Sequence, residues 1–306
     1  GSAEESTPSV AADSAGLNVV VHVMMLYTQG VRFGMAEPQR TAAIQSDFDV
    51  AIAQVNDDFA TSLISARVKL VKIAAVDYID PASRQGDELT TIAVNWQANM
   101  LTALRDTSDG VIDEIHPLRD QVGADLVCLV QNSPDSSSSG IAYVMDTPDD
   151  SSNPLFGFSV VGYDFLNPGH TFSHELGHNF GNAHARGDPQ AMGTKDGAYT
   201  YSYGYRFTGQ DGRAYHDIMA YDPGTRIFYF SNPNLTAPAP ISAPLGIAVG
   251  LAGETNAALT IDQSAFEVAN YRLQTQADAS NGTLVNVATR AFAGTGEQQL
   301  IAGFII

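Results

Sequence analysis

Apolar residues along the chain alternate between two patterns, one typical of buried strands and one typical of amphipathic helices. Helical spacing runs through 41–63, with Thr41 as the expected N-cap, and returns at 89–104. Strand-like apolar runs occupy 17–27, 67–78, 125–130, 140–145 and 156–163. In 67–78 the apolar residues fall out of phase, which predicts a bulge. Because strands alternate with helices, we expect an α/β fold in which helices cover a sheet.

The pattern changes beyond residue 185. Gly and Pro become frequent, and no long helical period returns until 261–273. We therefore expect a smaller, irregular C-terminal subdomain closed by one helix. Within it, 199–207 carries aromatic residues at every second position, which predicts a β-like stretch packed by one aromatic face. Lining of a cleft by these aromatic residues is the alternative.

The two ends of the chain differ from its middle. Residues 1–16 are small and polar and are expected to form a flexible N-terminus. The folded domain is expected to span 17–273, followed by a linker at 274–283. The apolar segments of 284–306 flank a Gly-Thr-Gly turn, which predicts a β-rich tail or the start of a further domain.

The net charge and the length of the apolar runs exclude some classes of partner. The 306 residues include 15 Lys plus Arg and 34 Asp plus Glu, a formal net charge of −19. An acidic surface repels phosphate, so we expect no nucleic-acid partner. The longest apolar run is far shorter than the roughly 20 residues of a spanning helix, so we expect no membrane span. Cys128 is the single cysteine and cannot form an internal disulfide.

One segment carries recognisable chemistry. Residues 174–184 read H-E-L-G-H-N-F-G-N-A-H, which matches H-E-x-x-H-x-x-G-x-x-H. On a helix, His174 and His178 lie one turn apart on the same face and reach one ion. Gly181 can adopt a positive φ that turns the chain back, so that His184 becomes a third ligand. Three imidazoles leave one position open, which predicts a catalytic zinc site with Glu175 beside it.

Other polar residues offer weaker candidates. His170 forms a second i,i+4 pair with His174, but Pro168 and Gly169 place it at a helix start, where a capping or surface role is expected. His216 could enter the cleft, whereas His22 and His116 are expected to be structural or surface residues. A calcium site at Asp146, Asp149 and Asp150 is possible, but EF-hand spacing is absent and a solvated loop is the expected alternative.

With Asp217-Ile-Met219-Ala-Tyr221 downstream, the zinc motif resembles the metzincin clan of zinc endopeptidases. More narrowly, residues 17–273 are similar to the bacterial reprolysin-like group that includes peptidyl-Asp metalloendopeptidases. The resemblance implies a twisted mixed sheet with helices in an N-terminal subdomain. It also implies a smaller C-terminal subdomain, with Met219 in a Met-turn beneath the three imidazoles.

The resemblance also implies roles for single residues. His174, His178 and His184 would bind Zn²⁺, Glu175 would be the general base, and Tyr221 would stabilise the oxyanion or pack beside the turn. An extended protein or peptide substrate would lie along an edge strand at Gly140, Ile141, Ala142 and Tyr143. Segment 222–229 would form the primed-side wall, where Arg226 receives an acidic side chain or serves the structure.

Three departures and one alternative accompany the resemblance. Ser139 and Phe165 stand where relatives often have a pair of cysteines, and Ala185 stands where several metzincin subgroups have a carboxylate. No propeptide cysteine is present, so the sequence indicates no latency mechanism. The resemblance implies a secreted protein, although no signal peptide is present in the sequence. The alternative function, suggested by 284–306, is a surface or toxin-like adhesion module in which proteolysis is secondary.

Overall fold

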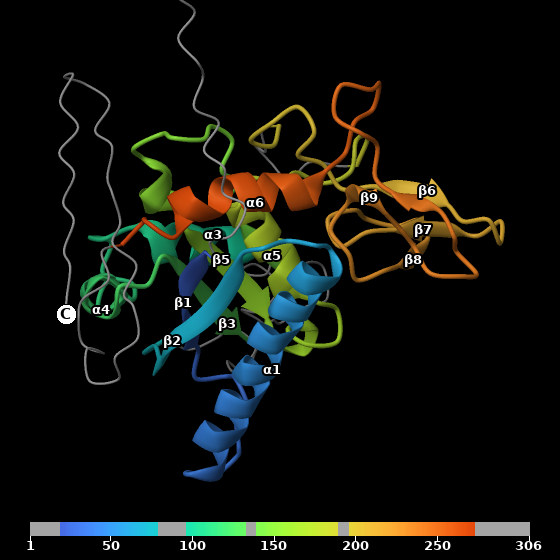
Figure 1. The fold of residues 1–306 in the computed structure, drawn as a ribbon. Helices are drawn as coiled ribbons and strands as arrows, with labels where there is room; N and C mark the ends of the chain where they lie inside the picture. The colour runs from blue at the N-terminus through green and yellow to red at the C-terminus, as the bar shows by residue number, and fades with distance from the viewer. Residues whose placement is uncertain (1–18, 79–95, 133–138, 189–195, 273–306) are drawn as a thin grey trace, which may run out of the picture.

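A five-stranded mixed sheet forms the centre of the molecule (Figure 1). The computed structural model describes residues 19–78, 96–132, 139–188 and 196–272. The strand order is β2-β1-β3-β5-β4, with four parallel strands and β4 antiparallel to β5. The strands are β1 (Val20–Tyr27), β2 (Arg67–Ala75), β3 (Leu126–Gln131), β4 (Gly140–Ala142) and β5 (Phe158–Gly162). The predicted α/β class is confirmed.

The five predicted strands are all present, but several are shorter than the apolar runs. β4 ends at Ala142 rather than 145. β5 is flanked along the chain by two 3₁₀ helices, η2 (Asn153–Phe156) and η3 (Tyr163–Phe165). The predicted bulge lies in β2. Val23 pairs with Leu70 and Met24 pairs with Lys72, so one β2 residue between them has no opposite partner.

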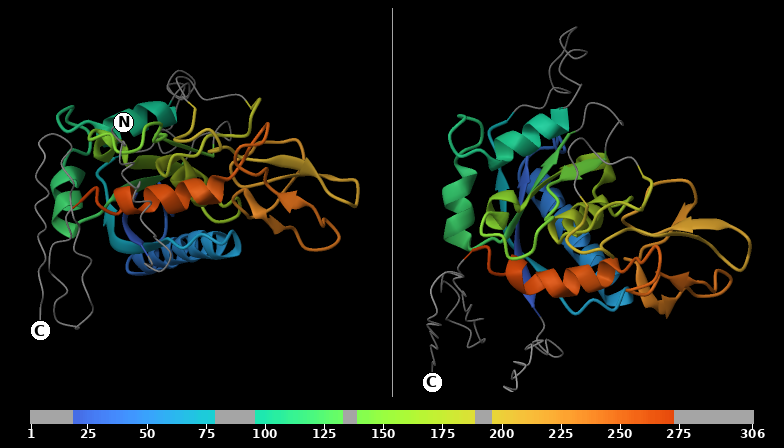
Figure 2. Two further views of the ribbon diagram at one scale, coloured as in Figure 1. Left: turned by 45° about the horizontal axis from the view of Figure 1, so that its top comes forward. Right: turned by 90° about the horizontal axis from the view of Figure 1, so that it is seen from above.

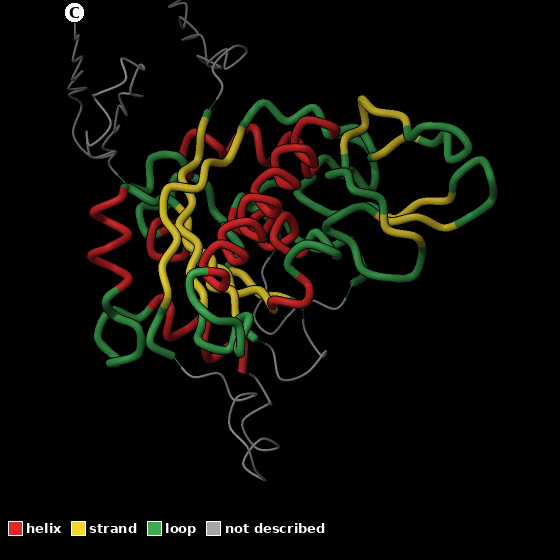
Figure 3. Tube along the Cα trace, turned by 90° about the horizontal axis from the view of Figure 1, so that it is seen from below, coloured by secondary structure: helices red, strands yellow, loops and turns green. Residues whose placement is uncertain are grey.

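Helices cover both faces of the sheet. Helices α1 (Gln39–Thr61), α5 (Thr171–Asn179) and α6 (Ala257–Val268) pack on one face, and α3 (Trp96–Arg105) and α4 (Ile115–Val122) on the other. Figure 2 shows the sheet between α1 and α3, and Figure 3 shows the strands in yellow beside the helices in red. Alternate side chains of β1 enter the two cores, Met25 on the α1 side and Met24 on the α3 side.

Several helix boundaries differ from the prediction. The expected cap Thr41 lies inside α1, and its hydroxyl donates instead to Glu37 at 2.7 Å. Helix α6 begins at Ala257, before the expected 261, because the Asn256 side chain accepts the Leu259 N–H as its cap. Helix α4 was not predicted. In the predicted helix 89–104, the described part begins at Trp96.

The chain after α5 forms short strands that lie together beside the sheet, at the right of Figures 1 and 2. They are β6 (Arg206–Thr208), β7 (Ala214–His216), β8 (Thr225–Arg226), β9 (Asn232–Thr236) and β10 (Pro244–Leu245). Only the end of the aromatic stretch 199–207 is a strand, although Tyr201 and Tyr203 are buried as the packing interpretation expected. The predicted segments 1–16, 274–283 and 284–306 lie outside the described residues.

Among the helices of the described residues, none combines the length and the apolar composition that crossing a membrane requires.

Candidate active site

Helix α5 carries the first half of the zinc motif into the centre of the molecule. All nine of its residues are buried, from Thr171 to Asn179. At the N-terminal end, the carboxylate of Asp58 in α1 accepts the Ser173 hydroxyl at 2.6 Å. Towards the other end, the Asn179 amide donates to the Tyr143 carbonyl at 3.0 Å and to the Phe158 carbonyl at 3.1 Å. The helix is therefore fixed to both α1 and the sheet edge.

A tight turn brings in the third histidine. Gly181 has φ of 99°, as the sequence predicted, and a Cβ there would lie 2.7 Å from the Cβ of Ala198. The Asn182 N–H donates back to the Gly177 carbonyl at 2.9 Å, and Ala183 forms a bridge with Tyr203. The next residue, His184, then faces α5.

The three imidazoles converge on one point. The Nε2 atom of His184 lies 3.2 Å from that of His174 and 3.1 Å from that of His178. A tetrahedral zinc ion with Zn–N bonds of about 2.0–2.1 Å separates its nitrogen ligands by about 3.3 Å. Among the described residues, these histidines form the one group of three or more His, Cys, Asp or Glu side chains arranged to hold a metal.

Hydrogen bonds to the other ring nitrogens fix which atoms face the centre. His174 Nδ1 lies 2.7 Å from the Ile218 carbonyl, and His178 Nδ1 lies 2.7 Å from the Asn182 carbonyl. A carbonyl only accepts, so each Nδ1 carries the proton and each Nε2 presents a lone pair. Two such lone pairs beside His184 Nε2 repel one another unless a cation lies between them. The site therefore fits zinc.

The electrostatic surroundings keep the rings neutral, as metal binding requires. Burial holds the pKa of His174 well below its usual value, and the imidazoles of His178 and His184 lower it further. Burial lowers the pKa of His178 to about 3, again with a contribution from His184.

Glu175 lies beside this centre in a dry environment. It is 3% exposed, and its Oε2 atom has no hydrogen-bond partner within the described part of the chain. Burial raises its pKa well above the usual range. Its carboxylate packs directly under Gly140 of β4, where a Cβ would lie 2.4 Å from Oε1. The Glu175 carboxylate and the edge strand are thus in direct contact.

Met219 packs against Gly177 of α5, in a turn that the Asp217 side chain stabilises. The Asp217 carboxylate accepts the Met219 N–H at 3.1 Å and the Ser231 N–H at 3.0 Å, and burial raises its pKa to about 7. Met219 is fully buried, and its Sδ packs so closely against Gly177 that a Cβ there would lie 2.4 Å away. The turn and α5 therefore fit together without room for a side chain at residue 177.

Tyr221 covers the third histidine. Its ring centroid lies 4.2 Å from that of His184, and the side chain remains 39% exposed. Burial and the charge of Glu175 raise its pKa to about 12, so the phenol keeps its proton at neutral pH. The Tyr221 N–H donates to Asp188 at 3.0 Å, and Asp188 is paired with Arg206. Asp188 was not predicted from the sequence, because this contact joins segments 33 residues apart.

The predicted substrate strand lies at the edge of the sheet, next to Glu175. Gly162 N donates to Ser139 O, and Tyr143 N to Phe158 O, so residues 139, 141 and 143 face β5. In an antiparallel pair the residues between them point the other way, so the backbone groups of Gly140 and Ala142 face outward. The Tyr143 ring instead packs against Phe156, at a centroid distance of 5.2 Å.

Arg226 in β8 lies close to the histidines. It donates to the Gly169 carbonyl at 2.9 Å, just before α5. Its positive charge adds to the lowering of the His174 pKa by burial and partly offsets the raised pKa of Tyr221. His170 is not part of the centre. Its ring stacks on Phe228 at 3.7 Å, and its Nδ1 lies 2.8 Å from Asp58 Oδ2. The Arg226–Gly169 hydrogen bond and the His170–Phe228 stacking thus join the 222–229 segment to the start of α5.

The remaining candidates lie apart from the histidines. His216 is buried, with Nδ1 at 3.0 Å from the Asp217 carbonyl. Asp149 donates its N–H to Glu267, and Asp150 accepts that of Ser152. His22 is half-buried in β1, and the His116 ring packs edge-on against Phe158. At the positions where relatives often have cysteines, the Ser139 carbonyl is bonded in the sheet and Phe165 ends η3.

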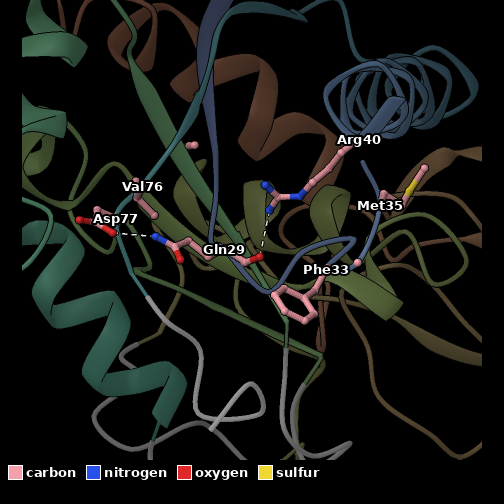
Figure 4. A pocket seen from close by; sticks show the side chains of 8 residues that line it. Gln29, Phe33, Met35, Arg40, Val76 and Asp77 are labelled. Carbon is pink, nitrogen blue, oxygen red and sulfur yellow. Dashed lines mark hydrogen bonds between the residues drawn. The ribbon is translucent and has the colours of Figure 1, made fainter. Parts of the chain in front are cut away.

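A cavity of about 570 Å³ opens away from the histidines, beyond the carboxyl ends of β1 and β2 (Figure 4). Figure 4 shows Gln29 bonded to Asp77 across it, with Phe33 at its rim and Arg40 on the α1 side. A second cavity of about 800 Å³ is lined by Tyr199, Tyr201 and Tyr203, among others.

Comparison with known proteins agrees with this geometry. The chain is 27% identical over 245 residues to a "Peptidyl-Asp metalloendopeptidase" of Stenotrophomonas maltophilia (strain R551-3), covering 78% of this chain and 50% of that protein. It is 28% identical over 287 residues to a protein of the same name from Pseudomonas aeruginosa, covering 86% and 42%. The chain therefore spans half or less of the length of these relatives.

A solved structure described as "Structure of a chaperone-substrate complex" is similar in fold, with a TM-score of 0.57 at 18% identity, covering 83% of this chain and 39% of that one. Residues 18–231 match a reprolysin-like family model described as Metallo-peptidase family M12. The chain belongs to metallo-peptidase family M12, and residues 18–231 are its reprolysin-like metallopeptidase domain.

Proposed function

We propose that residues 17–273 form the catalytic domain of a secreted zinc-dependent endopeptidase. The observation that carries the proposal is the position of His184 Nε2, which lies within 3.2 Å of Nε2 of both His174 and His178, with a buried carboxylate alongside. His174, His178 and His184 would hold the ion. A bound zinc ion would supply Lewis acidity and lower the pKa of a coordinated water from 15.7 towards about 7.

Three side chains are proposed to transfer the proton, stabilise the oxyanion and support α5. Glu175 takes a proton from the attacking water and returns it to the leaving amine, because its carboxylate is buried beside the histidines and has an unpartnered oxygen. Tyr221 donates a hydrogen bond to the developing oxyanion, since its phenol stays protonated and its ring covers His184. We interpret the turn at 217–221 as a Met-turn, in which Met219 supports α5 from below.

The substrate is proposed to be a protein or peptide bound in extended form. The backbone N–H and C=O of Ala142 face away from β5 and offer a donor and an acceptor to an added strand. This edge lies directly against Glu175, so a peptide paired with it passes the centre. Secretion is proposed from the bacterial relatives and from the resemblance.

Arg226 is proposed to select acidic side chains on the primed side of the cut. Arg226 is half-buried near His174 and Tyr221, and its positive charge contributes to the pKa of both side chains. The relatives carry the name peptidyl-Asp metalloendopeptidase, which fits a cation at this place. The chain has a net charge of −19, so a local cation is needed to attract an acidic residue.

The test is cleavage of a peptide library by the zinc-loaded protein and by Glu175→Gln. We expect the variant to keep its zinc and fold and to lose activity by at least about 10²-fold, since a general base contributes 10²–10⁴-fold. Undiminished cleavage by the zinc-bound variant would refute the assignment. Arg226→Gln is expected to reduce selectivity for Asp after the cut without abolishing turnover.

The alternative, an adhesion module with little activity, rests on 284–306, which lies outside the described residues. Zinc binding by the wild-type protein without cleavage of denatured protein would favour that alternative.

A further inference from the structure

Gly140 begins the edge strand β4, yet nothing in its backbone requires glycine. Its φ is not among the positive values of the chain, and it pairs with Val161 in regular antiparallel register. Glycine within a strand costs stability because it loses more conformational freedom and packs no side chain. The reason for glycine here is therefore the space around its Cα.

That space is filled by a single side chain. A Cβ at residue 140 would lie 2.4 Å from Oε1 of Glu175, 2.8 Å from Cδ and 2.9 Å from Cγ. These three atoms are its nearest neighbours outside the strand, and all belong to the proposed base. The contact is with the mobile end of a side chain rather than with backbone, so an added methyl displaces the carboxylate and leaves the strand in place.

We propose that Gly140 is a positioning residue for Glu175. The bare Cα lets the carboxylate lie against the strand that carries the substrate, and so sets the distance between the base and the bound peptide. A methyl group at residue 140 moves the carboxylate away from the point where the imidazoles converge. This inference rests on the proposed function, because Glu175 acts as a base only if the protein is a peptidase.

The experiment uses Gly140→Ala, Glu175→Ala and the double variant, all loaded with zinc. We expect Gly140→Ala to lower kcat by about 10²-fold, the usual effect of a misplacement of about 1 Å, with KM within about twofold of wild type. Ala at residue 175 removes the Cγ, Cδ and Oε1 atoms that the added Cβ would meet. In the Glu175→Ala background the same substitution should therefore change the residual kcat by less than about twofold.

A crystal structure of Gly140→Ala supplies a readout that does not depend on activity. We expect β4 to superimpose on the wild type and the Glu175 carboxylate to be displaced by about 1 Å or more. An unmoved carboxylate, a kcat within twofold of wild type, or an equal loss in both backgrounds would overturn the proposal. Loss of zinc or of folding in Gly140→Ala would also overturn it, since the glycine would then serve the fold.

The two proposals fail differently. If the wild-type protein cleaves no peptide, the proposed function fails, and the position of the carboxylate in the crystal still decides the role of Gly140 in placing it. If the wild type is active and Glu175→Gln is not, the function stands whatever the result at residue 140.

Discussion

The two edges of the central sheet are built in opposite ways. At the β2 edge, the exposed side chains include Lys69 and Lys72, two of the three lysines of the chain. The Asn56 amide of α1 donates to the Val68 carbonyl at 3.0 Å and accepts its N–H at 2.9 Å, so a side chain takes the place of a neighbouring strand. β4 contains Gly140, Ile141 and Ala142, none of them charged.

Lysines, bulges and covered backbone groups are devices that keep a sheet edge from pairing with another chain. β2 has all three, since the register shift also lies there. β4 has neither a lysine nor a register shift, and it lies against Glu175. The difference teaches that the β2 edge is protected against pairing, whereas β4 is the edge that we propose to bind the peptide.

Removal of the metal should have the largest effect and should separate the two edges. After chelation, kcat/KM is expected to fall by at least about 10³-fold, because several kcal/mol of transition-state stabilisation are lost. Hydrogen exchange should become faster at 140–145 and 174–184 and remain unchanged at 67–75. Equal acceleration at both edges would show that the ion stabilises the whole domain rather than one side. Restored protection on adding zinc is the control.

Ala142→Pro removes one outward N–H of β4. We expect kcat/KM to fall about tenfold, the value of roughly one hydrogen bond, with little change in Tm. Ile141→Pro is the matched variant. The backbone of residue 141 faces β5, so losing its N–H removes a hydrogen bond within the sheet and should lower Tm. If Ala142→Pro loses stability and Ile141→Pro does not, the register of the substrate strand is wrong.

Asn56→Ala uncovers the β2 edge. Loss of the two hydrogen bonds to Val68 is expected to cost about 2 kcal/mol of unfolding free energy in urea titration. Peptidase activity should be unchanged, since the Asn56 side chain bonds to the β2 edge and to none of the three histidines. The control is Gln45→Ala on the same helix, whose exposed partner is Asp49. That substitution should stay within about 0.5 kcal/mol.

Replacement of Lys69 and Lys72 by Ala should have the smallest effect on the folded monomer, within about 0.5 kcal/mol. Self-association measured by light scattering should nevertheless increase, although the net charge becomes more negative. The charge-reversed variant, with Glu at both positions, keeps a charged edge and should remain monomeric. If the Glu variant associates as much as the Ala variant, charge at the β2 edge does not prevent pairing.

Local spacing made much of the fold and site predictable. The buried strands appear as apolar runs because both faces of the sheet are covered. The i,i+4 histidines and the positive φ of Gly181 follow from helix geometry, and the structure has both. The convergence at His184 required only that the chain turn back after the helix.

Features that depend on distant partners were not predictable. Helix α4 lacks an apolar stripe because one of its two buried residues is Arg119, whose guanidinium bonds to the carbonyls of Ala124, Asp125 and Pro154. The same holds for Asn179 and Asp188, whose polar side chains look like surface residues until their backbone partners are known. Thr41 appeared as a cap because the sequence does not reveal that α1 starts earlier at Gln39.

The close packing of Met219 Sδ on Gly177 has a consequence for oxidation. A sulfoxide oxygen on this sulfur has no room while α5 and the turn are packed, and the fully buried side chain is shielded from peroxide. Met219 therefore reacts only when the helix and the turn part. Its oxidation rate, followed by mass spectrometry beside that of the exposed Met35, reports how often α5 separates from the turn that carries Met219.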